Sequence, residues 1–101
     1  MTDIPIACNM SALTPEQRQR RAALADHIKV KAEVYELPDG YVFSFANDEM
    51  WMTVAEFVDL ERRCCPFFTF ALEREMSGTV TLRLTGPEGT KEFIAAEILQ
   101  E

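Results

Sequence analysis

The chain has 101 residues, 48% of them hydrophobic and 27% charged, a balance typical of one globular domain over residues 1–101. Its net charge of −7 argues against nucleic acid as a partner, because an acidic surface repels phosphates. No apolar run approaches the ~20 residues of a membrane span. The first residues lack the basic and apolar regions of a secretory signal, so we expect a cytoplasmic protein with no membrane partner.

The chain begins with a segment, residues 1–12, that predicts an irregular lead-in carrying Cys8. A helix start follows, because Thr14 can cap, Pro15 suits the first helical position and Gln17 completes a capping box. We expect this Arg-rich helix to end near residue 27.

Strand patterns replace the helical pattern after this point. Apolar and polar residues alternate from Ile28 to Tyr35, which predicts a strand. Pro38-Asp39-Gly40 is a turn signal, and Tyr41, Phe43 and Phe45 then share one face of a second strand. The two strands predict a β-hairpin.

A second helix is predicted over residues 53–65. Thr53 and Glu56 have the spacing of a capping box, and Met52 can pack on Phe57 across the helix start. Because the residue before a proline avoids the helical region, we expect the helix to end at Cys64 or Cys65, just before Pro66.

The last third of the chain repeats the hairpin pattern. Residues 68–73 and 80–85 alternate between apolar and polar side chains, and Ser77-Gly78 predicts the turn between them. Gly86-Pro87-Glu88-Gly89 then opens a final helix. The predicted order is α-β-β-α-β-β-α, and it indicates an α+β fold with a four-stranded, mainly antiparallel sheet and helices on one face.

The most informative residues lie at the end of the second helix. At 100° per residue, Glu61 falls in the middle of an apolar face that includes Val58 and Cys65, with Cys64 at its edge. A buried carboxylate is costly unless it is paired, protonated or bound to a metal. We therefore expect Glu61 to be buried and coupled to the two cysteines.

Adjacent thiolates bind soft or borderline cations such as Zn²⁺, Cu⁺ or Hg²⁺. Glu61 lies three and four positions before the cysteines, so its carboxylate can reach the same ion. Cys8 would supply a further ligand from the lead-in, and its sulfur is then expected within about 6 Å of the sulfur of Cys64 or Cys65. His27 is an alternative fourth ligand. The hypothesis is a site for Zn²⁺, another thiophilic metal or a metalloid, formed by Cys8, Glu61, Cys64 and Cys65.

Two other readings of the same residues stay open. The cysteines could be plain core residues, with Glu61 paired to Arg62, Arg63 or another basic residue. They could also perform thiol redox chemistry, with Cys64 or Cys65 as nucleophile, although a helix C-terminus and a nearby carboxylate both oppose a thiolate. A strained disulfide between the two neighbours is also conceivable. No Ser-His-Asp arrangement is arguable with one histidine. The residues leave open whether the chain is an enzyme, and they favour a binding protein over a catalyst.

The whole chain resembles a group of small bacterial proteins of unassigned function. The resemblance rests on an early cysteine, the run Glu61-x-x-Cys64-Cys65-Pro66-Phe67-Phe68 and the later turn Gly86-Pro87-Glu88-Gly89. It covers most of residues 8–95 and includes Cys8. The group implies which residues matter and brings no activity with it.

Aromatic residues also predict self-association. Strand alternation places Phe67 opposite to Phe68 and Phe70, so one face cannot bury all three. An exposed Phe67 beside Pro66 would form an apolar patch, and such patches mark contacts. We therefore expect a homodimer, or a non-catalytic module that binds a partner through its sheet.

Overall fold

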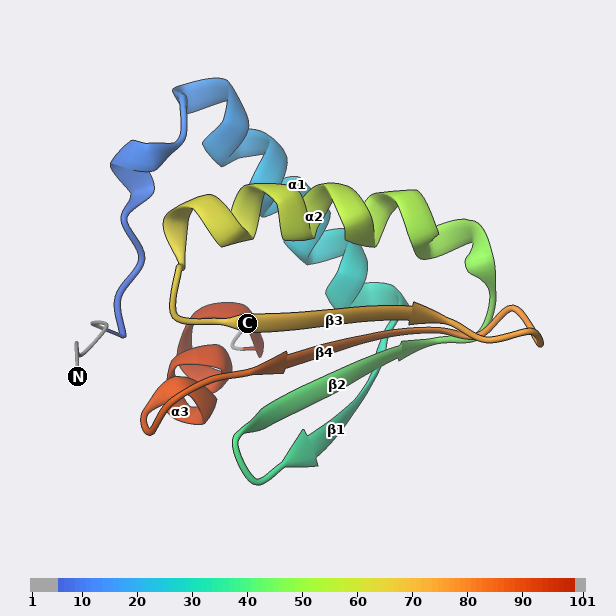
Figure 1. Ribbon diagram of the computed structural model, residues 1–101. Coiled ribbons are helices and arrows are strands. Elements are labelled where there is room, and N and C mark those ends of the chain that lie inside the picture. The colour runs from blue at the N-terminus through green and yellow to red at the C-terminus, as the bar shows by residue number, and fades with distance from the viewer. Residues whose placement is uncertain (1–5, 100–101) are drawn as a thin grey trace.

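The computed structural model describes residues 6–99, and the predicted α+β order of helices and strands is confirmed. Three helices and a four-stranded sheet form the framework (Figure 1). The helices and strands are α1 (Pro15–Lys31), β1 (Glu33–Leu37), β2 (Gly40–Phe45), α2 (Trp51–Cys64), β3 (Thr69–Arg74), β4 (Val80–Thr85) and α3 (Thr90–Ile94). Shorter turns are the 3₁₀ helices η1 (Met10–Ala12) and η2 (Asp48–Met50) and the π-helical turn η3 (Ala95–Leu99).

The sheet is antiparallel throughout, with strand order β1-β2-β4-β3. Its two central strands, β2 and β4, pair Phe43 with Leu82 and Phe45 with Val80. These four residues are at most 1% exposed, so the face of the sheet that carries them forms one side of the hydrophobic core. Helices α1 and α2 lie across this face of the sheet in Figure 1.

Helix α1 begins as predicted and ends later than predicted. Gln17 donates its backbone N–H to the Thr14 hydroxyl, and the Gln17 side chain accepts from the Thr14 N–H, which confirms the capping box. The helix continues through Lys31, so the strand predicted from Ile28 was wrong over its first part. Leu24 and Ile28 are four residues apart and both buried, and their packing favours helix over strand.

Helix α2 ends as predicted and begins differently. Its first turn is preceded by η2, where Asn47 accepts the backbone N–H of Glu49 at 3.0 Å. The predicted capping box at Thr53 is wrong, since Thr53 already lies inside the helix. Met52 is 73% exposed and does not cover the helix start, because the 3₁₀ turn has already set the direction of the chain.

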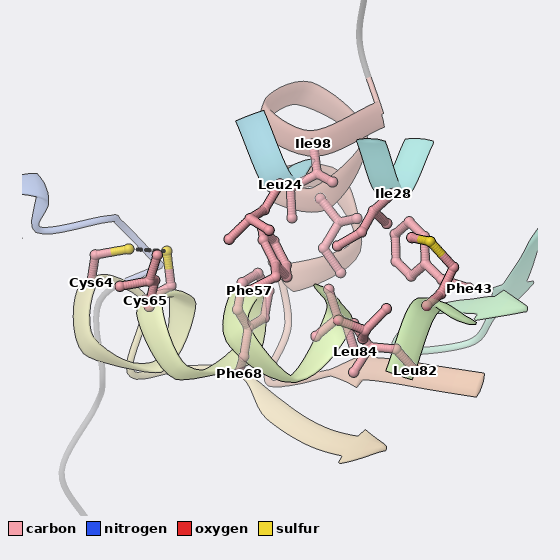
Figure 2. Packing of buried hydrophobic residues seen from close by; sticks show 14 of the residues in the cluster. Leu24, Ile28, Phe43, Phe57, Cys64, Cys65, Phe68, Leu82, Leu84 and Ile98 are labelled. Carbon is pink, nitrogen blue, oxygen red and sulfur yellow. Dashed lines mark hydrogen bonds between the residues drawn. The ribbon is translucent and has the colours of Figure 1, made fainter. Parts of the chain in front are cut away.

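The predicted exposure of Phe67 is wrong. Its side chain is only 4% exposed and meets the ring of Phe93 edge-on, with centroids 5.0 Å apart. Strand alternation does not apply to Phe67, because β3 starts two residues later at Thr69. Ile98 of η3 lies next to Leu24 and Ile28 of α1 in the same core (Figure 2). Ile94 of α3 is a fully buried member of this core.

Among residues 6–99, no helix combines the length and the apolar character that crossing a membrane requires.

Candidate functional site

The end of α2 brings two cysteine sulfurs together. Cys65 leaves the helical conformation at φ −127° and ψ 74°, and its N–H still donates to the Glu61 carbonyl at 2.8 Å. This change of direction before Pro66 offsets the 100° that separates neighbours on a helix. The Sγ atoms of Cys64 and Cys65 lie 3.7 Å apart, and both residues are fully buried (Figure 2).

The lead-in brings the third cysteine to the same place. Asn9 donates its backbone N–H to the Cys64 carbonyl at 2.7 Å. Arg18 of α1 donates to the carbonyls of Met10 and Leu13 at 3.1 and 2.9 Å. These bonds hold the lead-in against the end of α2 and place Cys8 there. The prediction that the three cysteines share one site is confirmed.

Two of the three sulfurs are covalently joined. Cys8 and Cys65 form a disulfide across 57 positions of sequence, with Cα atoms 4.7 Å apart, and Cys64 is the free cysteine. This pairing differs from the expectation of free thiols, and from the alternative of a bridge between the neighbours Cys64 and Cys65. The bridge instead uses Cys8, which the lead-in carries to the end of α2.

Glu61 is buried, as predicted, and its partner is Arg21 of α1. The guanidinium donates to both carboxylate oxygens, Nε to Oε1 at 2.7 Å and Nη2 to Oε2 at 2.9 Å. The Glu61 side chain is 0% exposed and that of Arg21 is 13% exposed. Arg62 and Arg63, the neighbours considered as partners, pair with Asp59 on the outer face of α2.

Sequence reasoning did not single out Arg21, although a signal was present. Arg21 lies three residues before Leu24 and seven before Ile28, which places it on the buried stripe of α1. A charge on such a stripe needs a partner of opposite sign. Only the crossing of α1 over α2 identifies that partner as Glu61.

Electrostatics at the site keep Cys64 protonated. Burial and the adjacent Glu61 carboxylate together raise the pKa of the Cys64 thiol to about 11, against a smaller opposing effect of Arg21. Burial works against the charged guanidinium of Arg21, but its two bonds to Glu61 outweigh this, and its pKa lies above the ordinary value. At neutral pH the site therefore holds an ion pair beside a neutral thiol.

The four predicted ligand residues form one compact cluster. Donor atoms of Cys8, Glu61, Cys64 and Cys65 all lie within 4.8 Å of one another, and the last three residues are buried. Glu61 Oε1 is 3.3 Å from the Cys64 sulfur and 3.4 Å from the Cys65 sulfur. The four residues form a group that could hold a metal ion.

His27, the alternative fourth ligand, lies elsewhere. It is exposed and lines a separate cavity beside Asn47 and Thr53, at the opposite end of α2 from the cysteines. Among the described residues, the candidate ligands at the cysteine cluster are therefore the three sulfurs and Glu61.

Comparison of the chain with family models, curated proteins and solved structures finds no match. The resemblance to small bacterial proteins stays a prediction. A function for this chain has to be argued from the geometry of its own site.

Proposed function

We propose that the reduced protein binds a thiophilic metal ion or metalloid through Cys8, Cys64 and Cys65, with Glu61 as the fourth ligand. The observation that carries the proposal is the grouping of four donor atoms within 4.8 Å, three of them on buried residues. Buried carboxylates and thiols are costly, and a bound cation stabilises both in their charged forms. Zn²⁺ is the ion to test first, because four-coordinate Zn²⁺ accepts both cysteine sulfur and carboxylate oxygen as ligands.

The spacing of the donors supports this ligand set. Two thiolates on one tetrahedral ion with bonds of ~2.3 Å would lie roughly 3.8 Å apart. The sulfurs of Cys64 and Cys65 are 3.7 Å apart. Coordination at this site would therefore need little movement of the helix end.

The Arg21 contact is compatible with a ligand role for Glu61. An ionised carboxylate offers about four lone-pair sites, and the guanidinium uses two of them. Oε1, the oxygen near both sulfurs, keeps one for an ion. Arg21 would then orient the carboxylate toward the ion, as outer partners orient ligands in many metal sites.

The test is a Zn²⁺ titration of fully reduced protein against a chromophoric chelator. We expect one ion per chain and release of protons on binding, since the Cys64 thiol must ionise. Single serine substitutions at Cys8, Cys64 and Cys65 should each weaken binding strongly. His27→Ala is the matched control and should change nothing, because His27 lies outside the cluster.

Glu61→Gln tests whether Glu61 binds the ion or is only a buried charged residue. The substitution keeps the shape of the side chain and removes its charge. If Glu61 supports the ion, Zn²⁺ affinity should fall ~10–100-fold, as when outer partners of metal ligands are removed. Unchanged Zn²⁺ affinity would remove Glu61 from the ligand set.

Thiol redox chemistry is the second candidate, favoured by the Cys8–Cys65 disulfide with a free thiol beside it. The weakness of this candidate is Cys64, whose pKa near 11 leaves little thiolate at neutral pH. Alkylation of Cys64 in the folded, oxidised protein measures this directly. Labelling at the rate of an exposed thiol would favour redox chemistry, and protection until unfolding would favour the metal site.

A further inference from the structure

We propose that the Cys8–Cys65 disulfide and a bound ion are alternative states of one site, so that oxidation empties the site and reduction reopens it. This inference rests on the proposed function, and it adds the regulation of that function. Its basis is that the same two sulfurs form the disulfide and belong to the four-donor cluster.

The oxidised cluster keeps too few donors to hold an ion. A disulfide sulfur carries no negative charge and is a poor ligand, since the thiolate is the metal-binding form. Oxidation therefore leaves Cys64 and Glu61. Two donors are fewer than the four that a closed tetrahedral Zn²⁺ site uses.

The reduced cluster keeps all four donors in place, because contacts other than the disulfide dock the lead-in. Asn9 binds the Cys64 carbonyl, and Arg18 binds two carbonyls of the segment that follows. Leu13 is 3% exposed and anchors the same segment in the core. Reduction of the disulfide thus frees the Cys8 thiol without releasing it from the site.

Access to the sulfurs gives the oxidation a defined order. Cys8 is half-buried, whereas Cys64 and Cys65 are fully buried, so an oxidant meets Cys8 first. With a low-molecular-weight disulfide, the Cys8 thiolate attacks one reagent sulfur and expels one reagent thiolate. The Cys65 thiolate then attacks the Cys8 sulfur and expels the second. Two protein thiols become one disulfide, the reagent disulfide becomes two thiols, and the ion leaves.

The test compares Zn²⁺ binding by one preparation in three states: reduced, oxidised with glutathione disulfide, and reduced again. We expect binding to weaken at least 100-fold on oxidation and to return on reduction. Peptide mapping should find the Cys8–Cys65 bridge in the oxidised protein. Zn²⁺-loaded protein should form this bridge at least tenfold more slowly than metal-free reduced protein.

The controls separate this inference from the proposed function. Cys64→Ser keeps the two bridging residues and should still form the bridge, whereas Cys8→Ser cannot. Equal binding by reduced and oxidised protein, or a Cys64–Cys65 bridge after oxidation, would overturn the inference and leave the metal site standing. Absence of Zn²⁺ binding in every state would overturn both.

Discussion

Arg20 and Arg21 are neighbours on α1 that each hold a glutamate of α2 through two hydrogen bonds. Their surroundings differ sharply. The Arg20–Glu56 side chains are 58% and 42% exposed, whereas those of Arg21 and Glu61 are 13% and 0% exposed. The same type of Arg–Glu pair therefore occurs once at the surface and once in the core. The contributions of an exposed pair and a buried pair to stability can thus be compared within one protein.

Arg21→Ala should destabilise the metal-free protein by about 3–5 kcal/mol, the usual cost of leaving one buried charge without its partner. Arg20→Ala is the matched control and should change the free energy of unfolding by a small fraction of that amount, because exposed pairs contribute little. Urea unfolding of the two variants measures the difference. Equal effects would mean that water reaches Glu61.

Cys64 should make the stability of the oxidised protein depend on pH in the alkaline range. Its pKa is about 11 when folded and roughly 8.5 when unfolded, so the unfolded chain loses the proton first as pH rises. Stability from this group is complete below about pH 8.5 and is lost toward pH 11. The loss should be on the order of 3 kcal/mol relative to Cys64→Ala, measured by urea unfolding at each pH. If the free energy of unfolding depends on pH in the same way for the wild-type protein and for Cys64→Ala, Cys64 is not a buried, protonated thiol.

At the scale of elements, the lead-in and α2 meet at the cluster, and several different contacts join them. The Asn9 and Arg18 hydrogen bonds satisfy backbone carbonyls, including the Cys64 carbonyl in the last turn of α2. The disulfide adds a covalent link to the same junction. The junction therefore has a noncovalent part, present in both redox states, and a covalent part that depends on oxidation.

Reduction should lower the stability of the metal-free protein by roughly 2–4 kcal/mol, because the disulfide closes a long loop and restricts the unfolded chain. Urea unfolding with and without a reductant measures this effect. Cys8→Ser should match the reduced protein and should not respond to the reductant. A response of Cys8→Ser to the reductant would show that another bridge contributes.

At the scale of the whole molecule, burial of Phe67 removes the patch from which a dimer was predicted, and the dimer itself stays a prediction. Other apolar side chains are exposed along the edge strand β1, namely Val34 at 38% and Tyr35 at 54%, with Val30 of α1 at 80%. An edge strand with unpaired backbone groups favours pairing with a second copy. We expect association through β1.

Sedimentation at micromolar concentration should give about twice the monomer mass. Val34→Lys should shift the protein toward monomer, because a charge on an edge strand opposes strand pairing. Met76→Lys is the control, since Met76 is 98% exposed in the β3–β4 turn, far along the chain from β1. A monomeric wild-type protein would rule out this dimer.

The sequence by itself determined the order of elements and the members of the cluster. Period-two patterns, turn residues and Pro66 are local signals. They predict strands, turns and a helix end because local backbone preferences determine where these elements form. Glu61 was found because a carboxylate on an apolar helix face conflicts with burial, whatever covers that face. Cys8 was named for the cluster because no local role explained it, and the described fold places it there.

Only the tertiary structure decided the partners of these residues. The continuation of α1 through Ile28, the burial of Phe67 against Phe93 and the pairing of Arg21 with Glu61 all depend on elements distant in sequence. The same holds for the disulfide, which joins Cys65 to a residue 57 positions away and leaves its neighbour Cys64 free. Patterns along a chain report which side chains must be buried, but the packing of helices and lead-in determines what each buried group meets.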